Sequence, residues 1–387
     1  ETRWSRFREQ ESGDRSQGTG DRDQGTGDSG ILQLPPRPSA EFSALPTQNA
    51  PGVILPLPDD LEPADRKLGD LLRSLDIIDR DTLHILWEEA RRQRRTLRHV
   101  LLAGGYLTLY QLALIESGNL NGLIFGRFRV IDRLLATARE TIYRVVDPQL
   151  GNQDDGTCLL RHLGEAEMLD AVRADEYRQR FATARDLAHP NVAATLELLE
   201  INSRPAVTQE WLHGLSGSDW PAAVSSPGVW HRLMMQAALA LHAAHSVGLT
   251  HGRLTANSFL LMRQGVVKLI GIGEPPWLHA GGAGGVASIE EDLKALGQVA
   301  SGWMQGGRRK GVRPKPFPGA LVDVLRGLGV APEGGGVPLA VYPTAAALLE
   351  DLDKAARSVP SDQGTWEKLL AYVDENAGDG IVLRQSA

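Results

Sequence analysis

Apolar residues recur with helical spacing across residues 59–122. Three successive segments each place apolar side chains three and four residues apart, which is typical of a helix with one buried face. These positions are Leu68, Leu71, Leu72 and Leu75, then Leu83, Leu86, Trp87 and Ala90, then Leu97, Val100 and Leu101. Gly104-Gly105 interrupts the pattern before a fourth helix around Leu109 to Ile115. The spacing predicts a compact module of three or four short helices.

The pattern changes near Gly126. Short runs rich in β-branched and aromatic residues, bounded by turn residues, are typical of strands. Such runs cover residues 128–134, 141–146, 158–163, 194–200 and 206–211. Helical spacing returns between Met168 and Leu187 and dominates after His213-Gly214. A small β-rich lobe followed by a larger helical lobe predicts an α+β fold.

The first 58 residues lack such periodicity. A stretch rich in glycine and aspartate, Gly13 to Thr19, recurs from Gly20 and starts again at Gly27. Segments so poor in apolar side chains bury too little surface to offset the entropy lost on folding. Residues 1–58 are therefore predicted to be disordered, with a stiff proline-rich linker at their end. A calcium-binding β-roll is disfavoured, because the seven-residue period has no recurring apolar position.

Composition narrows the class of protein. Apolar residues make up 42% and charged residues 23% of the 387 residues, as in an ordinary globular protein. The net charge of −7 does not favour nucleic acid or an anionic membrane as a partner. The single cysteine, Cys158, excludes an internal disulfide and fits a reducing compartment. No apolar run reaches the ~20 residues of a membrane span, and no signal peptide is recognisable. We therefore expect a cytoplasmic protein, with a targeting segment before Glu1 left open.

The order of elements and eight short motifs resemble the bilobal serine/threonine protein kinase fold. Residues 251–261 lie in the frame of the catalytic loop H-R-D-L-K-P-E-N-I-L-L, and residues 267–273 in the frame of V-K-L-x-D-F-G. The other motifs are residues 128–134 and 142–145 (first two strands), 189–192 (loop after the regulatory helix), 209–214 (hinge), 291–297 and 342–352.

The resemblance divides the chain into parts. It covers residues 126–355, with an N-lobe at about 126–212 and a C-lobe at about 215–355, and leaves residues 356–387 as a C-terminal extension with one helix. A helical module at residues 59–122, directly before such a domain, is similar to the arrangement in bacterial kinases of the planctomycete type.

The resemblance implies that the chemical positions of a kinase have changed. Arg161 stands in the frame of the lysine that pairs with phosphate, and Arg180 aligns with the glutamate partner of that lysine. The ion pair of an active kinase would thus become a repulsive pair. Arg253 replaces the catalytic aspartate, and losing a general base typically costs about 10²–10⁴ in rate. Gly271 replaces the metal-binding aspartate of D-F-G.

The resemblance also implies that the residues at the phosphate-binding and metal-binding positions have been replaced. Thr255 replaces the catalytic-loop lysine and Ser258 the metal-binding asparagine. Residues 134–141, in the frame of the glycine-rich loop, include no glycine, and Glu140 would place a carboxylate near phosphates. Mg²⁺ is usually held by one or two protein carboxylates besides substrate phosphates. The resemblance therefore implies no metal site and no catalytic residue, as in a pseudokinase.

The positions that the resemblance marks as structural are retained. They are His189, Asn191, His251 and Asp292, of which the last two are similar to residues that brace the catalytic loop. A hydrolytic triad of His251, Asp292 and a serine is disfavoured, because no G-x-S-x-G motif is present. The arginine-rich run at residues 91–98 is interpreted as a solvated helix face, because no base-reading pattern accompanies it.

Two classes of function stay open. The first is a binding, scaffold or allosteric module in signalling, whose partners are proteins, active kinases among them, rather than nucleic acid or membrane. The second is a protein that binds a nucleotide or anion without Mg²⁺, with or without transfer of a group from ATP by non-standard chemistry. For this second class, the candidate contacts are Arg161 and Arg253 and the hinge residues Glu210 and Leu212. We expect no metal and no obligatory cofactor.

Overall fold

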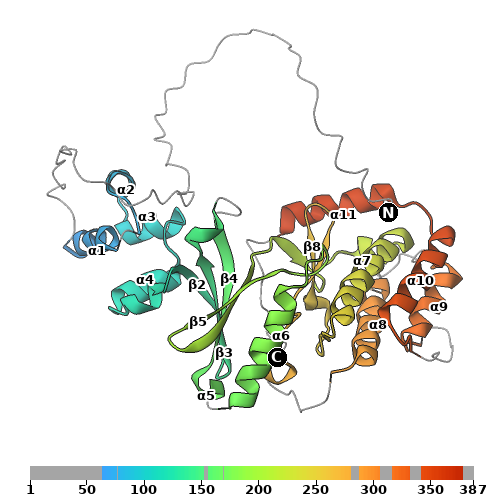
Figure 1. Ribbon diagram of the computed structural model, residues 1–387. Coiled ribbons are helices and arrows are strands. Elements are labelled where there is room, and N and C mark those ends of the chain that lie inside the picture. The colour runs from blue at the N-terminus through green and yellow to red at the C-terminus, as the bar shows by residue number, and fades with distance from the viewer. Residues whose placement is uncertain are drawn as a thin grey trace, which may run out of the picture. The chain divides into compact units, whose positions relative to one another are not determined.

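The computed structural model describes residues 63–75, 77–151, 156–168, 170–279, 287–305, 316–331 and 341–377 (Figure 1). The predicted disordered tail at residues 1–58 lies outside these ranges. Within them, four short helices are followed by a β-rich segment and then by a mainly helical segment (Figure 1).

Four helices form the N-terminal module. They are α1 (Pro63–Ser74), α2 (Arg80–Gln93), α3 (Leu97–Ala103) and α4 (Leu109–Glu116). The last three each begin after a residue whose side chain accepts a hydrogen bond from a backbone N–H of the first turn. These capping residues are Asp79, Thr96 and Thr108. The predicted apolar faces meet in one core, whose fully buried members include Leu72, Leu86, Leu97 and Leu101.

Helices α1 and α2 approach closely because Gly69 has no side chain. A Cβ placed on Gly69 would overlap the indole ring of Trp87, which is buried. Glycine in a helix interior costs about 0.5–1 kcal/mol relative to alanine. The close contact with Trp87 explains why α1 contains a glycine in spite of this cost.

Six antiparallel strands form the sheet of the N-lobe, in the spatial order β1-β2-β3-β4-β6-β5. They are β1 (Ile124–Phe125), β2 (Phe128–Ala136), β3 (Glu140–Val146), β4 (Thr157–Leu163), β5 (Thr195–Ile201) and β6 (Arg204–Glu210). Between β4 and β5 lie the short helix α5 (Glu165–Met168) and helix α6 (Ala171–Arg185), which packs against β5 and β6. The five predicted strands are confirmed to within two residues, and β1 was not predicted.

Helix α4 is bound to β2 through its own N-terminal cap. Thr108 Oγ1 accepts a hydrogen bond from Gln111 N, and Gln111 Oε1 accepts one from Thr108 N. The same side chains also donate to the strand, Thr108 Oγ1 to Ile131 O at 2.6 Å and Gln111 Nε2 to Val130 O at 2.9 Å. The strand register shifts between Val130 and Asp132. The cap therefore satisfies carbonyls at an irregularity of the sheet.

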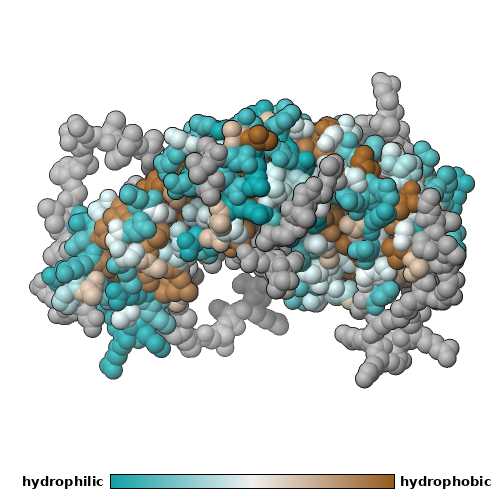
Figure 2. Space-filling view, turned by 90° about the horizontal axis from the view of Figure 1, so that it is seen from below, coloured by the Kyte–Doolittle hydropathy of each residue, from teal (hydrophilic) through white to brown (hydrophobic). Residues whose placement is uncertain are grey.

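Helix α4 is apolar around most of its circumference. Leu112 and Ile115 face the core of the module, and Tyr110 packs against the apolar cluster of the N-lobe sheet. Leu109 is 74% exposed. Figure 2 shows brown, apolar surface on the left, where α4 lies. Such surface is uncommon on a helix that contacts only solvent.

In the described residues, the C-lobe combines a small sheet with five helices. Its strands, β7 (Gly214–Ser216), β8 (Phe259–Met262) and β9 (Val267–Leu269), are antiparallel. Its helices are α7 (Pro227–Ser246), α8 (Ile289–Gln305), α9 (Gly319–Gly327), α10 (Ala345–Ala355) and α11 (Gln363–Asn376).

Short 3₁₀ turns connect elements in both lobes. They are η1 (Leu120–Leu123), η2 (Pro148–Leu150), η4 (Ala222–Ser225), η5 (Ala256–Ser258), η6 (Pro276–Leu278) and η7 (Ala356–Ser358).

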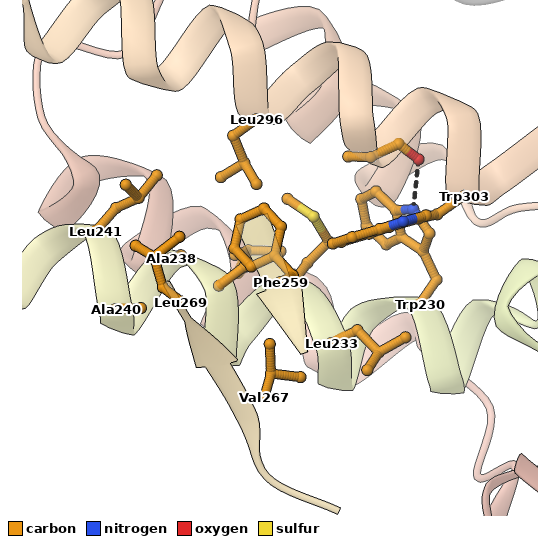
Figure 3. Close-up of a cluster of buried hydrophobic side chains, with 14 of the residues drawn as sticks. Trp230, Leu233, Ala238, Ala240, Leu241, Phe259, Val267, Leu269, Leu296 and Trp303 are labelled. Atoms are coloured by element: carbon orange, nitrogen blue, oxygen red, sulfur yellow. Dashed lines mark hydrogen bonds between the residues drawn. The ribbon is translucent and has the colours of Figure 1, made fainter. Parts of the chain in front are cut away.

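The C-lobe core surrounds α7 (Figure 3). The Trp230 side chain is fully buried, and its Nε1 donates to Ala300 O of α8 at 2.9 Å. The rings of Phe259 and Trp303 meet edge to face with centroids 5.4 Å apart, so β8 and α8 share the same core. Helix α11 contributes Trp366, Leu369 and Val373 to it.

The arrangement is that of a protein-kinase-like fold. A six-stranded sheet with one long helix is joined through residues 210–214 to a mainly helical lobe that begins with β7. The α+β, bilobal, kinase-like fold predicted from the motifs is thereby confirmed. Among the described residues, no helix is both long enough and apolar enough to span a membrane.

The contact between Gly69 and Trp87 predicts that Gly69→Ala destabilises the protein. The added methyl gains helix propensity but forces the indole to move, and overpacking costs about 1–3 kcal/mol. We expect a net loss of about 1–2 kcal/mol, measured by urea unfolding. The matched control is Gly302→Ala in α8, where a Cβ would meet no neighbour within 4 Å and where stability should rise by about 0.5–1 kcal/mol. Equal gains in both variants would contradict the close packing of α1 on α2.

Candidate functional site

Arg161 is the centre of the site. It lies on β4 with a side chain only 4% exposed. Its Nε donates to Glu140 Oε2 at 3.0 Å and its Nη2 to Glu140 Oε1 at 2.7 Å, a bidentate ion pair between adjacent strands. Arg161 Nη1 donates to Glu274 and, at 3.5 Å, to Gln209 Oε1. The guanidinium is therefore paired with two carboxylates of its own chain.

Glu274 lies in the segment after β9 and has a second partner, His279, whose Nε2 is 2.6 Å from Glu274 Oε2. Burial raises the pKa of Glu274, but the charges and hydrogen bonds of Arg161 and His279 outweigh it and hold this pKa well below its usual range. Burial raises the pKa of Glu140, and the charge of Glu274 adds to the rise. Two carboxylates thus share one arginine, and Glu274 is the more strongly ionised.

The expectation that Arg161 faces Arg180 is wrong. The residues of α6 on the Arg161 side are Tyr177, which is fully buried, and Phe181, whose ring centroid lies 5.8 Å from Arg161 Cζ. Arg180 Nη2 instead donates to Thr250 O at 2.7 Å. Positions 177 and 181 are one turn apart on the face toward the sheet, whereas position 180 lies on the face toward the C-lobe. The predicted repulsive pair is replaced by an arginine beside two aromatic rings.

The segment after β9 is attached to the N-lobe at several points. Arg139, in the turn between β2 and β3, donates to the carbonyls of Trp277 and His279. Trp277 Nε1 donates to Glu176 Oε2 of α6 at 2.7 Å. Leu278 is buried among apolar side chains of the N-lobe: Leu163, Val207, Tyr177 and Phe181. The turn in the frame of the glycine-rich loop is thus tied to the segment after β9.

Asp292, on α8, organises the loop that the resemblance assigns to catalysis. Its carboxylate accepts hydrogen bonds from His251 N and Gly252 N, each at 2.8 Å, and contacts His245 Nε2 at 3.0 Å. Burial raises the pKa of Asp292, but these hydrogen bonds outweigh it and lower the pKa below its ordinary value. The ring of His251 is fixed by its Nε2, 3.0 Å from Ile270 O. The loop is therefore braced from behind.

The remaining catalytic-loop positions have other partners. Arg253 is exposed, and its N donates to His251 Nδ1 at 3.2 Å. Thr255 is also exposed, while Ser258 is buried. Ser258 Oγ accepts a hydrogen bond from Thr255 N at 3.1 Å, so the hydroxyl is engaged in the turn at η5.

Gly271 is required by the backbone at the position of the D-F-G aspartate. Its φ is +87°, a left-handed conformation that favours glycine. A Cβ there would lie 3.1 Å from His251 Nε2. Gly273 also has a left-handed conformation, with φ +96°, and a Cβ placed there would overlap the ring of Phe181. The segment after β9 thus leaves the strand by a path that excludes side chains at both positions.

The two hinge residues, Glu210 and Leu212, make contacts that stabilise the fold. Glu210 Oε1 accepts from Ala194 N at 2.6 Å and pairs with Lys268 Nζ at 2.8 Å, and sequence reasoning missed this pair. Leu212 is buried in an apolar cluster with Ile142, Leu159, Trp211 and Leu260. In the loop after α6, His189 Nδ1 accepts from Asn191 N at 3.2 Å, and Asn191 Nδ2 donates to Val267 O at 2.9 Å. Asn191 therefore ties this loop to β9.

The described part of the chain shows no group of three histidine, cysteine, aspartate or glutamate side chains arranged to hold a metal ion. Cys158 is buried, and this burial raises the pKa of its thiol to about 12. Such a thiol stays protonated at neutral pH and is a poor nucleophile.

The fold is kinase-like and bilobal, and at the site an ion pair joins Arg161 of the N-lobe sheet to Glu274 of the segment after β9. No protein-family model and no curated protein matches the chain. Among solved structures it is similar to the kinase domain of PknI from Mycobacterium tuberculosis, with 20% identity, coverage of 61% of this chain and 98% of that one, and a TM-score of 0.43. It is also similar to the apo form of PpkA-294, with 14% identity, coverage of 60% and 98%, and a TM-score of 0.45. The likeness concerns the fold alone.

Asp292→Asn tests the brace of the loop. An amide leaves at least one of the N–H groups of His251 and Gly252 without a good acceptor, so we expect a loss of roughly 2–4 kcal/mol at pH 7. Because the pKa of Asp292 is lowered by folding, its contribution is present above about pH 4 and disappears as pH falls through the folded pKa. The variant should therefore lose less stability than the wild type on acidification below pH 4.

Urea unfolding at pH 7 and at pH 3 measures both effects. Asp323→Asn is the control, because Asp323 is exposed and, among the described residues, forms an ion pair with Arg326 one helical turn away, a pair worth about 0.3–0.5 kcal/mol. Equal midpoints for Asp292→Asn and the wild type at pH 7 would disprove the bracing role.

Proposed function

We propose that this protein is a catalytically inactive kinase-like protein that acts as a binding, scaffold or allosteric module in signalling. The cluster around Arg161 is the observation that carries the proposal. The side chain in the position of the phosphate-pairing lysine is already paired with Glu140 and Glu274. A phosphoryl group would have to displace a buried carboxylate before it could bind there.

The other chemical positions support the same function. Phosphoryl transfer depends on a residue that orients the nucleophile and on metal ions held by carboxylate and amide oxygens. The guanidinium of Arg253 carries N–H donors and no acceptor atom, so it offers no oxygen to orient a nucleophile or to hold a metal ion. Gly271 offers no ligand atom, and the Ser258 hydroxyl is engaged by Thr255 N. The architectural contacts of Asp292 are nevertheless complete, as expected for a kinase-like fold used as a scaffold.

The proposed partners are proteins, active kinases among them, rather than nucleic acid or membrane, and the proposed compartment is the cytoplasm. The net charge of −7 and a thiol suited to a reducing compartment support this assignment. The exposed Leu109 of α4 is apolar surface of the kind found where proteins associate.

A second candidate is a protein that binds ATP or another anion without Mg²⁺. The observation in its favour is Arg253, whose guanidinium is exposed and makes no ion pair with any described residue. In that case Arg253 and the backbone of the hinge at Glu210 and Leu212 would make the contacts, because Arg161 is already paired.

Thermal unfolding with ligands tests the proposal. The wild-type chain, melted with ATP, with ATP and Mg²⁺, and with inorganic phosphate, should show the same Tm in all three. Bound ligand at ~100 times its Kd would stabilise the folded state by about 2.7 kcal/mol, a shift that a melting curve resolves. A shift with ATP that does not need Mg²⁺ would favour the second candidate.

Turnover is the complementary measurement. Purified protein should release no phosphate from ATP in the presence of Mg²⁺. Metal-dependent turnover that is lost in Arg161→Ala would overturn the proposal, because it would place Arg161 in a working active site. Arg133→Ala, a change at an exposed position within β2 whose guanidinium lies over the ring of Tyr110 and not at the site, is the control for loss of an arginine as such.

A further inference from the structure

The two carboxylates on Arg161 are held in different ways. Glu140 lies on β3, next to β4 in the sheet, and contacts the Nε and Nη2 edge of the guanidinium. Glu274 lies outside any strand, in residues 274–279, and contacts Nη1. Residues 274–279, which we term the strap, contain only the single turn η6. Pairing within the sheet holds Glu140 beside Arg161. Glu274, in contrast, moves away from Arg161 whenever the strap moves.

Removal of the strap would expose two cationic groups at once. Arg161 Nη1 would lose Glu274, and Arg139 Nη1 would lose the carbonyls of Trp277 and His279. Arg161 would keep Glu140 on its Nε and Nη2 edge, and Arg139 Nε would stay 3.9 Å from Glu167 Oε1, so the Nη1 donors are the ones released. Both guanidinium groups now contact atoms of the strap, so both face the space that the strap fills. Guanidinium groups bind planar or tetrahedral oxyanions well, because their N–H donors are rigidly arranged.

We infer that the strap is an internal ligand, and that an oxyanion of the phosphate class binds between Arg161 and Arg139 only when Glu274 is displaced. This inference rests on the proposed function, since it concerns the same cleft. The carboxylate of Glu274 occupies the position that the phosphate oxygen would take. Partner proteins that pull on the strap would open an anion site, and anions at high concentration would favour the strap-free state.

The strap suppresses anion binding at Arg161 because it is covalently attached to the same chain and so competes at a high effective concentration. A tethered competitor acts at an effective concentration on the order of millimolar or higher, so a weak anion does not replace Glu274 in the wild type. The strap also has apolar anchoring, because Leu278 is buried against α6 and the sheet. Removing the charge at position 274 therefore weakens the competitor for Arg161 but leaves the apolar anchor in place.

Glu274→Gln is the direct test. In this variant, inorganic phosphate or ATP without Mg²⁺ should raise Tm by about 5–10 °C at ~100 times Kd, whereas the wild type should not respond. A response to both ligands assigns the site to phosphate as such, and a response to ATP alone assigns it to the nucleotide. The double variant Glu274→Gln with Arg161→Met should lose the response, which places the anion on Arg161.

The matched control is Glu176→Gln. Glu176 accepts from Trp277 Nε1, so this change also replaces a carboxylate that holds the strap but leaves Glu274 on Arg161. It should show no response to phosphate. A response equal to that of Glu274→Gln would overturn the inference, because phosphate would then bind while Arg161 and His279 still hold the Glu274 carboxylate in place.

Hydrogen exchange separates the possible failures. The amides of Glu274 and Leu278, which donate to Gly271 O and Pro275 O, should exchange faster in Glu274→Gln with phosphate than without it. If the strap amides exchange freely and phosphate still does not bind, the inference is wrong while the proposed function stands. If instead the wild type binds ATP with Mg²⁺ and turns it over, the proposed function itself is wrong.

If Glu274→Gln does not fold, His279→Ala replaces it. That variant removes a hydrogen bond to Glu274 itself, which weakens the hold on the competing carboxylate and allows it to leave Arg161, so the variant should respond to phosphate with a smaller shift in Tm. The absence of any shift in a folded His279→Ala, together with faster exchange of the strap amides, would also overturn the inference.

Discussion

A buried positive charge must be neutralised where it lies, and in this protein that charge is the guanidinium of Arg161. Leaving it unpaired would cost several kcal/mol. Glu140 neutralises it from the neighbouring strand and Glu274 from the far side of the cleft. The course of the chain after β9 meets this need, because it brings Glu274 to Arg161.

The same requirement sets the partners of Arg161. In a kinase, the corresponding positive charge is paired with one carboxylate and with the phosphates of its substrate. In this chain a second carboxylate takes the place of the phosphates, and two aromatic rings, those of Tyr177 and Phe181, take the place of the helix carboxylate. The bracing of the loop by Asp292 needs no ligand, so it persists unchanged.

The fold could be predicted from the sequence because buried side chains recur at short, regular intervals along each helix and strand. The apolar faces of α1 to α3 and the five predicted strands are visible as spacings of three to four and of two residues. Helix α6 was harder, because charged residues surround its buried face. Tyr177 and Phe181, one turn apart, were the available signal that this face, and not Arg180, meets the sheet.

The site could be predicted only in part, because its partners are far apart in sequence. Arg161 and Glu274 are separated by 113 residues, and no spacing rule connects them. Glu140 was noticed as a carboxylate near the phosphate position, but its pairing depends on the register of β3 and β4. The engagement of Ser258 by Thr255 N and of Glu210 by Lys268 likewise depends on backbone geometry that residue types alone do not specify.

The cap of α4 has a consequence for the history of the protein. Thr108 and Gln111 cap their own helix and satisfy two carbonyls of β2 with three side-chain atoms, Thr108 Oγ1 and Gln111 Oε1 and Nε2, so neither partner is complete without the other. A helical module joined in this way cannot be exchanged by recombination at the start of the β-rich lobe without exposing those carbonyls. The module and the lobe are therefore expected to have been inherited together, as one unit of descent.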